Sequence, residues 1–208
     1  MTLAHVSIVL VTLINFIILV YYCWQTYYQR IKPALAMWIF FTIAVALCLT
    51  TYLSSGEFSI WDNIVNTTDL VLVSTVTIVI FFFGDRSSRF TRFDTGCLIA
   101  VLTILGFWLI TQNHMLTNVL VQIIQIIAYF PVVKRLWQSG KNSESFIAWI
   151  GMLLAPAISL LSSKGILATI YSVRAVVCIS ILLILMLKIE VTEQLVKKQL
   201  LNNPAKLP

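Results

Sequence analysis

Charged residues are scarce in this chain. Of its 208 residues, 11% are Asp, Glu, Lys or Arg and 60% are hydrophobic, and the mean hydropathy is +0.95. A soluble domain of this length cannot hide so much apolar surface from water. The scarcity of charge therefore excludes an ordinary soluble protein and indicates an integral membrane protein.

The motifs of enzymes and metal sites are missing as well. Glycine occurs seven times, and no stretch has the spacing of a phosphate-binding loop. No nucleophile stands beside a base, and the two histidines are isolated. We interpret the four cysteines as buried thiols because they lie in or beside apolar stretches without metal or redox spacing: Cys23, Cys48, Cys97 and Cys178. The sequence predicts a protein that is not an enzyme, without catalytic residues, metal or cofactor.

Long apolar runs are abundant instead. A hydrocarbon core about 30 Å thick requires about 17–25 apolar residues per helix. Seven segments meet this requirement: 3–23, 33–53, 61–83, 93–111, 114–134, 145–163 and 165–188. We predict an all-α membrane protein with seven transmembrane helices and no soluble domain. The first span has no basic segment before it and no small-residue cleavage site, so we expect it to be retained.

The basic residues are distributed unevenly among the connections. Those that follow the first, third, fifth and seventh spans are Arg30, Lys32, Arg86, Arg89, Arg92, Lys134, Arg135, Lys141, Lys188, Lys197, Lys198 and Lys206. The alternate connections hold only Lys164, and Arg174 lies inside a span. Because positive charge favours the cytoplasmic side, we expect the N-terminus outside and the C-terminus in the cytoplasm. The net charge of +6 then reflects topology and not a nucleic-acid partner.

Two stretches of the chain are similar to each other. "FIILVYYCWQTYYQRIKPALAMW" (16–38) and "YFPVVKRLWQSGKNSESFIAW" (129–149) align Trp24-Gln25 with Trp137-Gln138. Each leaves an apolar helix, crosses a basic loop and enters the next helix with a Trp. Such similarity predicts a duplicated three-helix unit.

An extra span between two three-helix units gives both units the same orientation in the membrane. We therefore expect a 3+1+3 arrangement with four parts: a first bundle (1–83), a cytoplasmic loop and linker helix (84–112), a second bundle (113–188) and a cytoplasmic tail (189–208). The tail is expected to form a short helix that ends near Pro204.

The second of the similar stretches resembles a known family. Its Pro131 ends an apolar helix, basic residues follow, and Glu144-Ser145 come before the next helix. With the 3+1+3 order, this resembles the PQ-loop/SWEET (MtN3-like) transporter superfamily, above all its small bacterial seven-helix members, and more distantly the KDEL receptor topology. The chain departs from the family pattern at Val132, where the Gln of the PQ dipeptide is expected, and at Ile18, where a proline is expected.

Two opposite charges are predicted to lie at the same depth in the membrane. Asp69 and Arg174 each follow the outer start of their span, near Ile60 and Gly165, by nine residues. At about 1.5 Å per residue this is about 14 Å, near the centre of the hydrocarbon. Either charge alone costs at least about 2.5–3.5 kcal/mol there. We expect Arg174 to neutralise Asp69, directly or through water, as a binding or proton site, or else as a structural clamp.

Further polar residues are expected around this pair. Asn66 shares a face with Asp69, and Gln122 and Gln125 form a stripe with Asn118 on the fifth span, with Tyr129 one turn further. A stripe of amides cannot face lipid, so it lines a cavity or bonds to a neighbouring helix. Tyr171 is a further candidate.

Two prolines are candidate hinges. Pro131 and Pro156 interrupt the fifth and sixth spans, and each removes a backbone hydrogen bond.

From these features we expect a membrane transporter that moves a small polar or anionic solute by alternating access. Its partners would be that solute and the lipid bilayer, without nucleic acid, and the sequence leaves the oligomeric state open. Two alternatives remain: a receptor or cargo-binding protein of the KDEL-receptor kind, and a non-transporting scaffold. The expected location is the inner (plasma) membrane of a bacterium, in multi-pass form.

Overall fold

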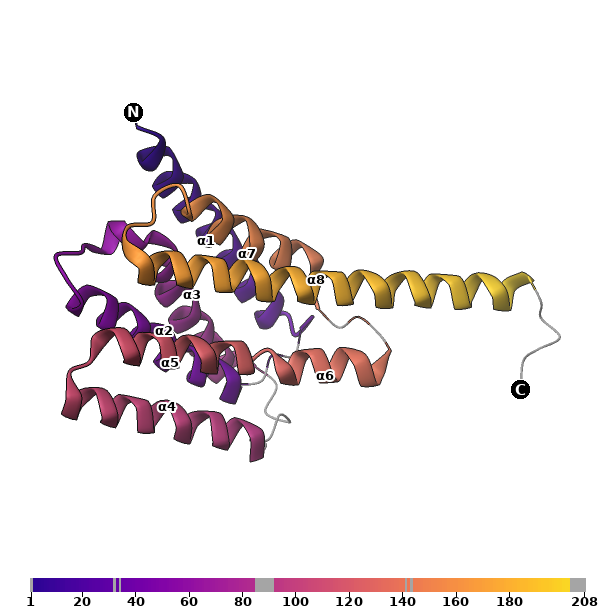
Figure 1. Cartoon of the computed structure of the whole chain (residues 1–208). Helices are drawn as coiled ribbons and strands as arrows, with labels where there is room; N and C mark the ends of the chain where they lie inside the picture. Colours follow the sequence, from indigo (N-terminus) through magenta and orange to yellow (C-terminus); the bar gives the residue numbers. More distant parts are fainter. Residues whose placement is uncertain are drawn as a thin grey trace.

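Helices make up all the regular structure in the part of the chain that the computed structural model describes, namely residues 2–31, 33, 35–84, 92–140, 142 and 144–202. Figure 1 shows their arrangement. The elements are α1 (Leu3–Tyr27), α2 (Leu35–Ser54), the short 3₁₀ helix η1 (Ile60–Asn63), α3 (Ile64–Phe83), α4 (Arg92–Thr111), α5 (His114–Ile127), α6 (Phe130–Ser139), α7 (Phe146–Ser159) and α8 (Gly165–Asn202).

Six helical runs among the described residues are long and apolar enough to cross a membrane. They are Leu3–Tyr27, Met37–Ser54, Ile60–Phe83, Arg92–Thr111, His114–Gln138 and Gly165–Leu195. A shorter apolar helix, Phe146–Ser159, lies where the sixth span was predicted. The prediction of an all-α, multi-pass membrane protein is therefore confirmed.

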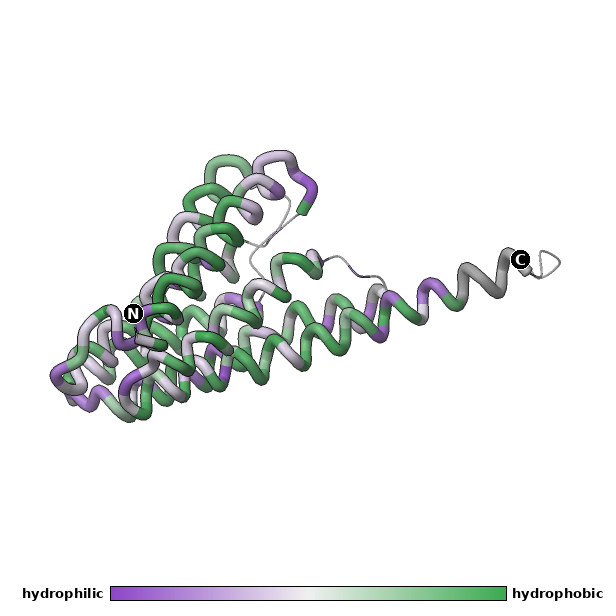
Figure 2. Tube along the Cα trace, turned by 90° about the horizontal axis from the view of Figure 1, so that it is seen from above, coloured by the Kyte–Doolittle hydropathy of each residue, from purple (hydrophilic) through white to green (hydrophobic). Residues whose placement is uncertain are grey.

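The surface of the bundle matches a lipid environment. Large apolar side chains project outward from its helices, with Ile110 86% exposed and Ile147 69% exposed. Figure 2 shows hydrophobic residues along the helices, whereas hydrophilic ones gather at the connections and along the projecting part of α8. Such a surface is stable against hydrocarbon and not against water.

The sixth predicted span is shorter in the structure than in the sequence analysis. Helix α7 has 14 residues, which is about 21 Å at about 1.5 Å per residue, less than the hydrocarbon thickness of about 30 Å. Serines end it, because the Ser162 and Ser163 hydroxyls both donate to the Ser159 carbonyl. In the remainder of the predicted span, residues 160–162 form a turn and residue 163 has no regular structure.

The last helix is longer than expected. Helix α8 has 38 residues and continues without interruption through the segment that we predicted as a separate tail helix. No glycine or proline occurs between residues 166 and 203 to break it. Its final part projects beyond the other helices (Figure 1). Pro204 lies outside the described residues.

The fifth predicted span is broken in its second half. Helix α5 ends at Ile127 and α6 begins at Phe130, one residue before Pro131. Proline has no N–H for the carbonyl of Ile127 four residues earlier, so the regular hydrogen-bond pattern stops there. The Tyr129 N–H instead donates to the Ile126 carbonyl (3.1 Å). The break is at the position where the sequence analysis placed a hinge.

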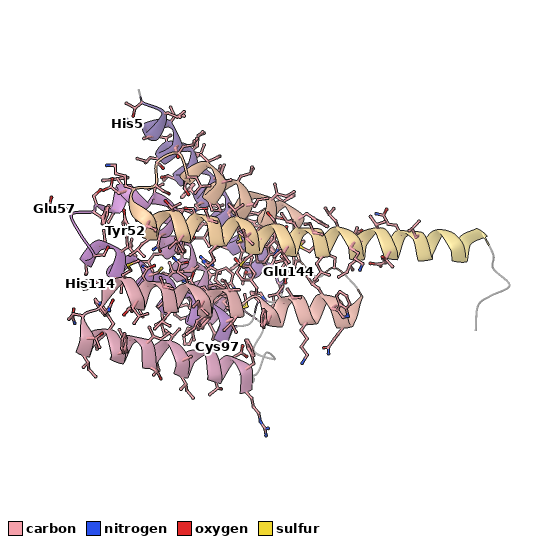
Figure 3. All side chains as sticks on the ribbon, viewed as in Figure 1. His5, Tyr52, Glu57, Cys97, His114 and Glu144 are labelled. Atoms are coloured by element: carbon pink, nitrogen blue, oxygen red, sulfur yellow. The ribbon has the colours of Figure 1, made fainter. Side chains whose placement is uncertain are left out.

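The helices form a bundle with two distinct ends. At the first end, α1, α5 and α8 begin, and His5, Glu57 and His114 lie there in Figure 3. At the second end, α2, α4 and α7 begin and α8 leaves the bundle. The connection between α3 and α4 falls largely outside the described residues.

Packing follows a recurring order. Helix α3 packs against both α1 and α2, and α8 packs against α5, α6 and α7. These groups meet through the pairs α1–α7 and α2–α5, and α4 packs on α2 and α5. The largest buried cluster joins the first group to α4 and α5 through residues such as Val11, Ala44, Val101 and Val121, which are fully buried.

Candidate functional site

A cavity of about 100 Å³ lies between the helices of the two groups. Its lining comes from α2, α3, α5, α6, α7 and α8 and from Ala128 and Tyr129 at the α5–α6 break. Since Met37 and Trp38 on α2 and Trp149 on α7 come from the starts of their helices, the lining extends toward the second end. A water needs about 10–15 Å³ in this measure, so the cavity has room for several waters or a small solute.

The ionisable, phenolic and amide groups of the lining are those that the sequence singled out. They are Asp69, Gln125, Tyr129, Tyr171 and Arg174. The rest of the lining is apolar or aromatic, including Trp38, Phe41, Val45, Met152 and the predicted hinge residue Pro156. An apolar pocket with a few convergent polar groups is the usual form of a small-molecule site.

Asp69 is held by neutral donors from two other helices. The Tyr171 hydroxyl of α8 donates to Asp69 Oδ2 (2.9 Å), and Asn15 Nδ2 of α1 donates to Asp69 Oδ1 (3.0 Å). Asn15 also donates to the Thr68 hydroxyl (2.7 Å), which fixes its amide. The carboxylate is therefore oriented, and each oxygen keeps a second lone pair for another donor.

Arg174 is held by a different set of groups. Its Nε donates to Gln122 Oε1 of α5 (2.7 Å), and its guanidinium lies over the Tyr171 ring at 4.8 Å from the ring centroid. The residue is 9% exposed. The Tyr129 side chain also hydrogen-bonds to Arg174. Since a guanidinium carries five N–H groups, Arg174 retains further donors at the cavity.

The direct ion pair between Asp69 and Arg174, one of the two arrangements predicted from the sequence, is not formed. Asp69 accepts hydrogen bonds from Tyr171 and Asn15, and Arg174 Nε donates to Gln122, so neither charge contacts the other. Tyr171 stands between the two charges instead, because its hydroxyl contacts Asp69 and its ring contacts Arg174. Both charges still line the same cavity.

Gln125, one of the residues predicted from the sequence, has no hydrogen-bond partner in the site. It is fully buried and lines the cavity, yet neither its Oε1 nor its Nε2 has a hydrogen-bond partner. Each buried donor or acceptor of an amide that lacks a hydrogen-bond partner destabilises the protein by about 1–3 kcal/mol. A molecule in the cavity that completes these hydrogen bonds would remove this cost.

Two other predicted residues lie beside the cavity and not in its lining. Gln122 bridges Arg174 to Asn118 through its Nε2 (3.3 Å), and Asn118 in turn donates to the Cys48 carbonyl and the Thr51 hydroxyl of α2. In the orientation that satisfies its amide, Asn66 contacts the α2 backbone. The amide stripe on α5 thus faces protein and cavity, as predicted from its spacing.

The first end of the bundle is closed by a compact set of contacts. Lys164 Nζ lies 2.6 Å from Asp62 Oδ1, and the Lys164 N–H donates to the Asp62 carbonyl (2.9 Å). The Tyr52 hydroxyl donates to the Lys164 carbonyl (2.9 Å), and Tyr52, labelled in Figure 3, stacks on Phe58. Gly165 has φ +78 and lies so close to Phe58 that a side chain there would clash.

Sequence reasoning missed the residues that shape the cavity. Trp38, Phe41 and Trp149 belong to apolar runs, where nothing in the local pattern separates a cavity wall from a lipid-facing side chain. Asn15 on α1 contacts Asp69 directly. Its polarity within an otherwise apolar span was the available signal.

Comparison with known proteins adds no relative. No family model, no curated protein and no solved structure matches this chain. The candidate site therefore rests on the geometry described above.

Proposed function

We propose that this protein is a membrane transporter that moves a small polar or anionic solute by alternating access, with Asp69 and Arg174 as its binding or proton-coupling site. The observation that carries the proposal is the central cavity, which holds an acid and a base that are not paired and a buried amide without partners. Ionisable groups inside a membrane protein generally mark solute or ion pathways.

The proposal includes a 3+1+3 arrangement of the SWEET type. Its support is the recurring packing order, since α3 lies between α1 and α2 as α8 lies between α5 and α7. If α1, α2 and α3 are matched with α5, α7 and α8, the contact between α1 and α7 corresponds to the contact between α5 and α2. In each group the first helix also supplies an amide to the charge on the third: Asn15 to Asp69, and Gln122 to Arg174.

We also propose that the first end faces the outside of the cell. The described residues Arg30, Arg92, Lys134 and Lys188 belong to the second end or to the part of α8 that leaves the bundle, as expected for a cytoplasmic side. In that orientation the Lys164–Asp62 contacts close the outer side, and the cavity extends toward the cytoplasm. This would be the inward-facing state of an alternating-access cycle.

The cavity also bears on the alternative of a rigid scaffold. A clamp that only holds two bundles together needs a direct contact between the charges and a filled interior. The structure has room for water between the helices and no direct contact between Asp69 and Arg174. We therefore favour transport.

A screen of metabolites with wild-type protein and the Asp69→Asn variant tests the function. We expect at least one solute to be taken up by proteoliposomes and to raise the thermal unfolding temperature of the wild type. Asp69→Asn should lose both responses while the protein still inserts and purifies. Glu57→Gln, an exposed change in the loop before η1, is the control and should retain both. If Asp69→Asn retains the full response, the Asp69 carboxylate is not part of the solute site.

A further inference from the structure

We infer that the cavity binds a zwitterion with a large apolar body, such as an α-amino acid with an aromatic or long aliphatic side chain; this inference rests on the proposed function and specifies its substrate class. Three observations carry it: the separation of the two charges, the free donor and acceptor of Gln125, and the composition of the cavity wall.

The charges in the cavity favour a ligand that carries both signs. Asp69 and Arg174 have opposite charges, line the same space and are not in contact with each other. A carboxylate alone would leave the apolar cavity with a net negative charge, and an amine alone with a net positive charge, and either is costly at low dielectric. A zwitterion keeps the site neutral, with its carboxylate at Arg174 and its ammonium at Asp69.

The hydrogen-bonding capacity of each charged residue fits this placement. The guanidinium of Arg174 is a planar fork that suits a carboxylate, and its contacts with Gln122 and Tyr129 leave further N–H groups for a ligand. Each Asp69 oxygen accepts one bond from the protein, so a lone pair is left for an ammonium hydrogen. Because Tyr171 contacts both residues, it holds the two poles of the site at a fixed separation.

Gln125 discriminates between a zwitterion and a simpler ion. Both ends of its amide lack partners, so a complete ligand must accept from Nε2 and donate to Oε1. A carboxylic acid anion satisfies only the donor, and an amine satisfies only the acceptor. An α-amino acid offers a carboxylate and an ammonium side by side, and therefore satisfies both.

The wall of the cavity indicates the remainder of the ligand. Besides Tyr171, the aromatic side chains of Trp38, Phe41, Tyr129 and Trp149 line it together with Met37 and Met152. Aromatic faces and flexible thioethers pack well against a flat or branched apolar group. A short polar side chain would leave this wall uncovered.

Binding of four probes to purified wild-type protein in detergent tests the substrate class. The probes are L-phenylalanine, 3-phenylpropionate, which lacks the ammonium, phenethylamine, which lacks the carboxylate, and glucose, which is polar and uncharged. We expect phenylalanine to bind at least about tenfold more tightly than any other, since a charged hydrogen bond contributes about 1.5–3 kcal/mol. Equal binding of 3-phenylpropionate, or no binding of phenylalanine, would overturn the inference.

The Gln125→Leu variant tests the role of the amide. Since Gln125 has no partner in the protein, its replacement should leave the unfolding temperature of the free protein unchanged or higher, whereas phenylalanine affinity should fall at least about tenfold. Gln138→Leu, at an exposed position on α6, is the control and should bind normally. Unchanged phenylalanine binding in Gln125→Leu would contradict the proposed site.

The two proposals can fail separately. If phenylalanine does not bind but uptake of another solute depends on Asp69, the transporter function stands and the zwitterion class is wrong. If no solute is taken up and Asp69→Asn behaves as the wild type, both proposals are wrong.

Discussion

At the scale of single residues, Tyr171 has the central position in the site. It is 1% exposed, and it combines a hydrogen bond to Asp69 with a ring contact to Arg174. The hydroxyl therefore contacts Asp69, whereas the ring contacts Arg174. A change that removes one and keeps the other can separate the two contributions.

Tyr171→Phe removes the hydroxyl and keeps the ring. We expect a loss of about 1–3 kcal/mol in stability, because one oxygen of the buried carboxylate loses its donor. Solute affinity should fall too, since Asp69 is less well oriented. Thermal unfolding and solute binding in detergent measure the two effects.

Tyr28→Phe is the matched control, because Tyr28 is 52% exposed and lies at the end of α1. It should change neither quantity. Wild-type stability in Tyr171→Phe would mean that the hydroxyl contact to Asp69 contributes nothing.

Residues of the candidate site could be predicted from the sequence where a polar side chain occurs within an apolar span. Asp69, Arg174 and the amides on α5 stand out for this reason, and the structure brings most of them to one cavity. The contacts between them were not predictable, because spacing along a helix does not determine which side chain of a neighbouring helix lies opposite. Tyr171 therefore stands where a direct ion pair was expected.

At the scale of elements, the contact between α1 and α7 depends on a glycine. A Cβ at Gly151 would lie 2.8 Å from Cδ1 and 2.9 Å from Cγ1 of Ile18. The two helices can approach this closely because Gly151 has no side chain. In membranes, close approach of helix backbones commonly requires small residues.

Gly151→Leu should separate α1 from α7. We expect a loss of about 1–3 kcal/mol in stability, because the added side chain overlaps Ile18 and overpacking has about this cost. Thermal unfolding in detergent measures it.

Gly106→Leu on α4 provides the comparison, since a Cβ there has no atom within 4 Å. It should be neutral or stabilising, because leucine favours a helix more than glycine does. Equal stability of the two variants would show that α1 and α7 can move apart freely.

The existence of the helices followed from apolar run length, whereas some of their ends did not. Pro131 marked the break between α5 and α6, because the effect of proline on a helix is local. The early end of α7 arose from serine hydroxyls that bond to the Ser159 carbonyl, and such side-chain contacts leave little trace in hydropathy. The continuation of α8 beyond the predicted span follows from the absence of glycine and proline between residues 166 and 203.

At the scale of the whole molecule, the orientation in the membrane remains the main prediction from the sequence. It rests on the unequal distribution of lysine and arginine between the two ends. The structure offers exposed positions at both ends where it can be measured. Glu57 lies in the loop before η1 (Figure 3). Gln194 is exposed on the C-terminal part of α8.

Cysteine labelling from one side of the membrane tests the orientation. In a background with the four native cysteines replaced, Glu57→Cys should react with a membrane-impermeant maleimide added to intact spheroplasts, and Gln194→Cys should not. Both should react after the membrane is permeabilised. Labelling of Gln194→Cys alone in intact spheroplasts would reverse the assignment of the two ends.

The unbroken course of α8 allows a small rotation at one of its ends to produce a larger displacement at the other. Twenty-eight residues separate Arg174 from Asn202, which is about 42 Å at about 1.5 Å per residue. If the helix pivots rigidly by about 5° near Arg174, simple geometry on this length moves its far end by about 4 Å. A small rearrangement around the cavity would then be amplified at the far end of α8, where a fluorophore or a partner protein would report whether the site is filled.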